Sequence, residues 1–148
     1  MQINRPFEST WLAVFLLVIV THLPYAQANV SDIQLKNFSV EQGLSQGTVI
    51  DIIEDADGYM WFATMDGLNK FDGKNFVSYF PSSNSDSSLA NEYARKLFID
   101  SQDTLWVATL GGISRYVSEK DQFISYTSKN SLLESNETFA MAETLVLS

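Results

Sequence analysis

The sequence predicts an all-β protein built from two copies of one four-stranded antiparallel sheet, with a partial copy on either side. Three observations lead to this prediction: an internal repeat, apolar runs with the length of strands, and Asp-Gly pairs between those runs. The 148 residues include 45% hydrophobic and 13% aromatic side chains, which is enough apolar surface for a core. The length by itself favours a single domain.

The repeat relates residues 55–71 to residues 100–116 at a constant offset of 45 positions. The identical pairs that define it are Asp55 and Asp100, Trp61 and Trp106, Thr64 and Thr109, and Gly67 and Gly112. Beyond these segments the second copy contains two extra residues, which shift Phe76 and Tyr79 onto Phe123 and Tyr126. Repeats of this length indicate stacked copies of one small structural unit.

Four strands fit each copy. They are expected at residues 48–53, 59–64, 67–71 and 75–80, and again at 94–99, 104–109, 112–116 and 122–127. Four-stranded units of about 45 residues have the length of a β-propeller blade. The predicted organisation is an N-terminal strand and lead-in (29–47), a blade (48–80), a linker (81–93), a second blade (94–127) and the start of a truncated third blade (128–148).

Tight turns are predicted at three Asp-Gly pairs, residues 57–58, 66–67 and 72–73. Gly adopts positive φ without steric cost, and Asp hydrogen-bonds the turn locally. In the second copy, Gln102 and Asp103 stand where the first pair has Asp57 and Gly58. Although Asp tolerates the left-handed conformation better than most residues, we expect a looser turn there.

The first 28 residues are typical of a secretory signal peptide. Residues 11–20 contain no polar side chain, and the tripeptide at 26–28 is Ala-Gln-Ala. We expect cleavage after residue 28. The alternative is an uncleaved anchor, which takes about 20 apolar residues, whereas residues 21–24 interrupt the apolar run. On both interpretations the remaining chain is exported.

Composition excludes several classes of function. The chain has 18 acidic and 9 basic residues, a net charge of −9, and the basic residues are scattered, which argues against nucleic-acid and membrane-surface binding. It has no cysteine, and its one histidine, His22, lies in the predicted signal peptide. A Ser-His-Asp triad, a Cys-His pair and thiolate metal sites are therefore excluded, and no cofactor is expected.

Two acidic patterns have structural interpretations. Residues 55–58 resemble part of a calcium-binding loop, but Ile53 would occupy the first ligand position, so a side-chain-capped turn is predicted instead of a metal site. Asp57, Asp66 and Asp72 contain the carboxylates that a glycosidase would need. Because each also belongs to an Asp-Gly turn, no catalytic residue is predicted.

The repeated Trp and Thr residues are also expected to be structural. Side chains repeated at one strand position point into the same layer of every unit, so Trp61 and Trp106 are predicted to lie in the core between adjacent sheets rather than to stack on sugars. The hydroxyl groups of Thr64 and Thr109 are expected to bond the backbone or a neighbouring strand. Asp55, Gly58, Asp100 and the glycines at 67 and 112 complete this structural set.

The order of these motifs resembles the two-component regulator propeller repeat. The residues that carry the resemblance are Gly43-Leu-Ser45, Asp55-x-x-Gly58-x-x-Trp61-x-x-Thr64, the run from Asp66 to Gly73, and Phe76-x-x-Tyr79. The resemblance covers residues 33–126. It implies the periplasmic sensor region of a membrane-bound bacterial signalling protein, usually with two seven-bladed propellers and a small β-sandwich. In that family a transmembrane helix and a cytoplasmic histidine kinase or cyclase follow, and the ligands known for some members are oligosaccharides.

The resemblance therefore implies that this chain is the N-terminal fragment of a non-catalytic, ligand-sensing propeller. Further blades, and a downstream segment that anchors the full-length protein in the inner membrane, are expected. The ligand is expected to be an oligosaccharide or another small molecule. The loops on one rim, with Met65, Asp66, Leu110 and Gly111, are predicted to lie nearest to it.

Two alternatives remain open from the sequence. One is a fragment of a secreted propeller enzyme that acts on polysaccharide, which a carboxylate pair at the central channel would favour. The other is a non-functional truncated remnant, because two blades leave unpaired strand edges. A downstream kinase or cyclase would favour the sensor.

Overall fold

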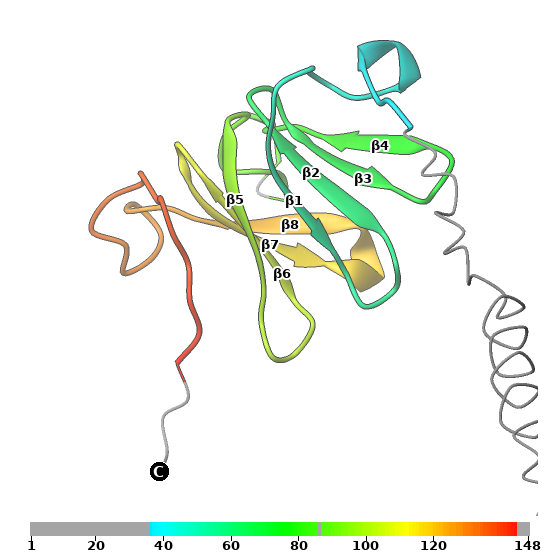
Figure 1. Ribbon diagram of the computed structural model, residues 1–148. Coiled ribbons are helices and arrows are strands. Elements are labelled where there is room, and N and C mark those ends of the chain that lie inside the picture. Colours follow the sequence, from blue (N-terminus) through cyan, green and yellow to red (C-terminus); the bar gives the residue numbers. More distant parts are fainter. Residues whose placement is uncertain (1–35, 86, 145–148) are drawn as a thin grey trace, which may run out of the picture. The chain divides into compact units, whose positions relative to one another are not determined.

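The computed structural model describes residues 36–85 and 87–144. These residues form two four-stranded antiparallel sheets, each with its strands in sequence order, β1-β2-β3-β4 and β5-β6-β7-β8 (Figure 1). The predicted all-β class and the two predicted sheets are thereby confirmed. The predicted signal peptide, residues 1–28, and the first part of the lead-in, residues 29–35, lie outside the described residues.

The two sheets are near copies of each other. The first contains β1 (Val49–Glu54), β2 (Met60–Thr64), β3 (Leu68–Phe71) and β4 (Phe76–Tyr79), and the second contains β5 (Ala94–Ile99), β6 (Leu105–Thr109), β7 (Gly112–Val117) and β8 (Gln122–Tyr126). Two short 3-10 helices, η1 (Val40–Gln42) and η2 (Ser118–Lys120), lie outside the sheets. Every predicted strand is present, and no strand begins or ends more than one residue from its predicted position.

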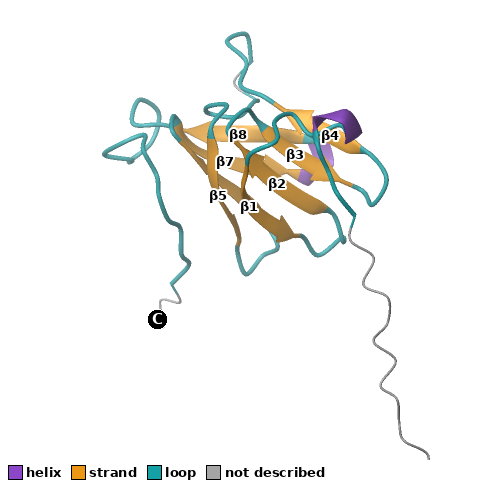
Figure 2. Ribbon diagram, turned by 45° about the horizontal axis from the view of Figure 1, so that its top comes forward, coloured by secondary structure: helices purple, strands orange, loops and turns teal. Residues whose placement is uncertain are grey.

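The sheets stack face to face, and we call their contact surface the seam (Figure 2). Trp61 on β2 lies at its centre and is completely buried. Its ring centroid is 4.8 Å from that of Tyr116 on β7 and 6.5 Å from that of Phe123 on β8. The aliphatic residues buried in the same cluster are Ala63, Leu68, Leu89, Ala94, Leu97, Leu105 and Val107. One indole therefore joins the apolar faces of both repeats.

A polar contact ties the first strands of the two sheets together. The Asp51 carboxylate accepts a hydrogen bond from the Leu97 backbone N–H at 2.8 Å. It also forms an ion pair with the Lys96 ammonium group at 2.9 Å. Partial burial would raise the pKa of Asp51, but these two partners together lower it. The charged carboxylate thus holds β1 beside β5.

The outer face of the first sheet is covered by the chain's own lead-in. Phe38 packs on this face, with ring centroids 4.8 Å from Phe71 and 5.4 Å from Phe76. Phe71 and Phe76 align with Tyr116 and Phe123 of the second sheet, so Phe38 takes the position on the first sheet that Trp61 takes on the second. The described part of the predicted N-terminal strand, residues 36–47, forms no strand; Ser39 and Gln42 close a capping box around η1 instead.

The outer face of the second sheet is less completely covered. Trp106, the counterpart of Trp61, is partly exposed and packs against Tyr126 at 6.0 Å between ring centroids. Within residues 128–144 the structure contains no strand, and Leu132 in this segment is fully exposed. The third blade expected from residue 128 onward therefore stays a prediction.

The turn expected to be looser in the second copy is in fact equivalent to its counterpart. Asp103 adopts φ 58° where Gly58 has φ 84°. The Asp103 N–H bonds the Asp100 carbonyl at 3.0 Å, as the Gly58 N–H bonds that of Asp55 at 3.0 Å. The prediction of a looser turn is wrong, because the carboxylate of Asp100 caps the turn as Asp55 does in the first copy.

Replacing Trp61 and Trp106 separately should show how much each indole contributes to the free energy of unfolding. We expect Trp61→Ala to lower the free energy of unfolding by about 3–5 kcal/mol, because it opens a cavity under both sheets. Trp106→Ala is the matched control and should cost about 1–2 kcal/mol, since this indole is only partly covered. Urea unfolding followed by circular dichroism measures both values, and equal losses would contradict the central position of Trp61.

Gly67 should not tolerate a side chain. Its φ is 95°, and an added Cβ would lie 2.8 Å from the Tyr79 carbonyl oxygen. We expect Gly67→Ala to lower the free energy of unfolding by about 3 kcal/mol. Gly47→Ala, where a Cβ meets nothing within 4 Å, is the control and should change the urea midpoint little.

Candidate functional site

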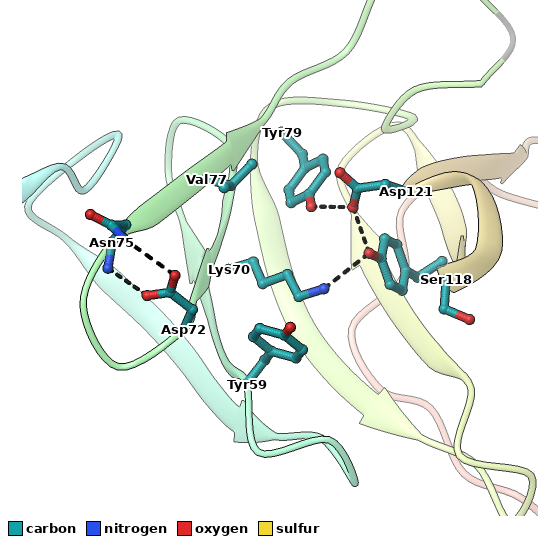
Figure 3. Close-up of a pocket in the computed structure, with 9 residues that line it drawn as sticks. Tyr59, Lys70, Asp72, Asn75, Val77, Tyr79, Ser118 and Asp121 are labelled. Atoms are coloured by element: carbon teal, nitrogen blue, oxygen red, sulfur yellow. Dashed lines mark hydrogen bonds between the residues drawn. The ribbon is translucent and has the colours of Figure 1, made fainter.

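A pocket of about 320 Å³ opens at the seam, between the first sheet and the β7–β8 turn of the second (Figure 3). We call it the seam pocket. Its partly buried lining consists of Tyr59, Lys70, Tyr79 and Tyr116. Its exposed rim consists of Asp72, Asn75, Val77, Ser118 and Asp121. Both repeats therefore contribute to one concave site that combines polar and apolar surface.

Lys70 crosses the seam within this pocket. It projects from β3, and its Nζ donates a hydrogen bond to the Tyr116 hydroxyl of the second sheet at 3.2 Å. The same Nζ lies 3.9 Å from the ring centroid of Tyr59 and 5.2 Å from those of Trp61 and Tyr116. Aromatic faces attract a cation in this geometry. The ammonium group is thus held at a defined place among three rings.

Asp121 joins the two sheets from the other side of the pocket. Its Oδ1 accepts hydrogen bonds from the hydroxyls of Tyr79 at 2.6 Å and Tyr116 at 2.5 Å. Burial, followed by the hydrogen bond to Asp121, raises the pKa of each tyrosine above its ordinary value. Burial would also raise the pKa of Asp121, but the two phenols and the charge of Lys70 lower it overall. Asp121 is therefore an ionised acceptor.

The two-residue insertion in the second repeat explains why Asp121 reaches the first sheet. The β3–β4 ladder ends with the pair Phe71 and Phe76. The β7–β8 ladder continues past the equivalent pair, with one more pair formed by Val117 and Gln122. The turn after this longer ladder contains η2 and ends with Asp121 at φ 51°. The insertion thus carries a carboxylate across the seam.

Asp72 forms the opposite rim of the pocket. Its carboxylate accepts hydrogen bonds from the backbone N–H groups of Asn75 at 2.6 Å and Lys74 at 2.8 Å, and these bonds lower its pKa. A general acid in glycoside hydrolysis instead needs a raised pKa. Both carboxylates of the seam pocket are therefore suited to accept hydrogen bonds from a ligand and not to protonate one.

The repeated residues make equivalent hydrogen bonds in both sheets. The indole N–H groups of Trp61 and Trp106 donate to Asp55 and Asp100 at 2.7 and 2.8 Å. The Thr64 and Thr109 hydroxyls donate to the carbonyls of Gly67 and Gly112, both at 2.8 Å. These bonds connect each turn to its own sheet.

The rim loops predicted to lie nearest a ligand do not line the seam pocket. Met65 and Asp66 form the β2–β3 turn, and Leu110 and Gly111 form the β6–β7 turn. The seam pocket lies at the opposite ends of these strands, beside the β1–β2 and β3–β4 turns, and none of these four residues lines it. Their proximity to a ligand stays a prediction. Asp57 and Asp66 also lie outside the pocket, so of the three candidate carboxylates only Asp72 lines it.

Sequence reasoning missed the residues that build the seam pocket. Tyr59 aligns with Thr104, and Asp121 lies in the turn that the insertion extends, so both are positions at which the repeats differ. A search for such differences would have found them. Across residues 36–85 and 87–144, no three His, Cys, Asp or Glu side chains converge to hold a metal ion. Within the same ranges no helix is long and apolar enough to cross a bilayer.

The charge of Asp121 should make the seam sensitive to acid. Because its pKa is lower in the folded than in the unfolded chain, its contribution to stability is present above the unfolded value, about 3.9, and is lost as pH falls through the folded value. We expect Asp121→Asn to reduce the urea midpoint at pH 7. The difference in urea midpoint between the variant and the wild type should become smaller as the pH is lowered. Glu119→Gln, in the same turn, is the control, and a difference independent of pH would contradict the prediction.

Comparison with known proteins places these features in a family context. Residues 43–66 match the family model for the two component regulator propeller. A protein of Formosa agariphila called histidine kinase P4 is 42% identical over 69 residues, which are 46% of this chain. The chain spans only 5% of that kinase.

Solved structures agree with this match. A structure described as the extracellular domain of a hybrid two-component system, BT3049 of B. thetaiotaomicron, superposes with a TM-score of 0.61 and 33% identity, over 69% of this chain and 15% of that one. The extracellular domain described for BT4673 of the same species gives 0.52 and 26%, over 63% and 13%. The resemblance of the two repeats to the two-component regulator propeller family is confirmed by these matches.

Proposed function

We propose that this chain is part of the exported, ligand-sensing β-propeller of a bacterial transmembrane signalling protein, and that it binds a carbohydrate without chemically changing it. The observation that carries the proposal is its 33% identity to a domain described as the extracellular part of a hybrid two-component system. The predicted signal peptide is consistent with an exported domain. Kinase or cyclase activity would belong to other parts of such a protein.

The chemistry of the seam pocket supports binding rather than catalysis. Tyrosine rings, an ammonium group and two carboxylates line a concavity of a size that suits a small ligand. The pKa values of both carboxylates are lowered, so neither has the properties of a general acid. A sensor needs such a site to favour one of two conformations when ligand is bound.

Calorimetry combined with a reducing-end assay tests this function. The 148-residue chain is titrated with cellobiose, xylobiose and lactose, and the same mixtures are assayed for new reducing ends. We expect heat from at least one sugar, with a dissociation constant of about 1 mM or tighter, and no increase in reducing ends. New reducing ends would favour the polysaccharide-degrading alternative, and absence of heat with all three sugars would reject carbohydrate sensing.

A further inference from the structure

We propose that the seam pocket binds a single neutral pyranose unit, whose hydroxyl groups span from Asp72 to Asp121 across Lys70. This inference rests on the proposed function for its choice of carbohydrate, but it assigns the site and the charge of the ligand from the geometry alone. It differs from the rim-loop position that the sequence predicts, because the pocket lies at the opposite ends of the strands.

The first argument is that the pocket is built where the repeats differ. Positions that serve the fold recur in both sheets, as Trp61 and Trp106 do with equivalent bonds. The pocket instead uses Tyr59, which the second copy replaces with Thr104, and Asp121, whose turn lies beyond the extra ladder pair that the insertion adds. In stacked repeats, insertions concentrate on a face that is often used for binding.

The second argument concerns charge. Lys70 lies between Asp72 on one side and Asp121 on the other (Figure 3). An anionic ligand such as a uronate would approach two carboxylates, and a cationic ligand would approach an ammonium group. Both arrangements place like charges close together, which opposes binding. A neutral molecule avoids both conflicts.

The third argument concerns hydrogen bonds. An ammonium group has three donors, and among the described residues Lys70 uses one, toward Tyr116. Asp121 receives both phenols on Oδ1, and its Oδ2 accepts no bond from the described residues. An ammonium donor near Asp121, together with carboxylate acceptors on both rims, suits a ligand with several hydroxyl groups, since each hydroxyl both donates and accepts.

The fourth argument concerns shape. Val77 lies above Lys70 in Figure 3 and Tyr59 lies below it, so apolar surface borders the polar groups of the pocket. The C–H faces of a sugar ring can pack on such surface while its hydroxyls reach the carboxylates. An open-chain polyol would have to be ordered on binding, whereas a ring is already rigid and loses less entropy.

The test uses amide chemical shifts of the 148-residue chain in a ¹⁵N-labelled sample. D-glucose, D-galactose, D-mannose and D-xylose are titrated separately, with D-glucuronate and D-galacturonate as charged counterparts. We expect at least one neutral sugar to shift the amides of Lys70, Asp72 and Asp121. Its uronate should bind about tenfold more weakly, equivalent to about 1.4 kcal/mol.

Two variants and one control assign the site. Lys70→Met should weaken binding of the neutral sugar about tenfold, because it removes the ammonium donor. Asp72→Asn keeps an acceptor for its turn but removes a charge, so it should reduce the discrimination against the uronate. Arg115→Met, at the position equivalent to Lys70 in the second repeat and outside the pocket, should leave the affinity unchanged.

The outcomes separate this inference from the proposed function. If a sugar shifts only residues 65–67 and 110–112, the sensing function stands and the seam site is overturned. Equal affinity for a sugar and its uronate, or unchanged affinity in a folded Lys70→Met variant, also overturns it. If none of the neutral sugars shifts any amide, the seam site is rejected, and the disaccharide calorimetry decides separately whether carbohydrate sensing is rejected as well.

Discussion

The packing of one indole between two sheets is the interaction on which this structure depends. A four-stranded sheet with apolar residues on both faces cannot be stable alone, because one face would remain in water. One face of the first repeat is buried because the Trp61 ring packs against Tyr116 and Phe123 of the second. Its indole N–H donates to Asp55, so the one polar atom of the ring is also satisfied. The seam, the pocket beside it and the contacts of Lys70 all follow from this placement.

Most of the fold could be predicted from sequence because its determinants are local. Short apolar runs define a strand, and Asp-Gly pairs define a turn, over a few positions each. The repeat, offset by 45 residues for the first three strands and by 47 for the last, then provides a second, independent prediction of each strand. The expectation of a looser turn at Asp103 was wrong, because an Asp in the left-handed conformation replaces Gly there without loss of the turn's hydrogen bonds.

The candidate site could not be predicted in the same way, because its contacts join residues far apart in the chain. Tyr79 meets Asp121 only after both sheets have formed and stacked. The same holds for Phe38, whose role as a cover for the first sheet depends on where the lead-in returns. Leu89 lies in the predicted linker, yet it is buried in the seam, at the position equivalent to the buried Leu44 of the lead-in. Comparing the two repeats therefore identifies the residues that both copies share, but it does not identify the contacts that form only between the two sheets.

The double hydrogen bond to Asp121 has a geometric consequence for the array. One phenol comes from each sheet and both converge on the same oxygen. Rotating one sheet against the other would lengthen at least one of these bonds, so the carboxylate resists twisting about the stacking axis. In radially repeated sheets, the rotation from each unit to the next determines how many units complete a circle. By placing Asp121 between the two sheets, the two-residue insertion thereby restricts the number of such units that could close a ring.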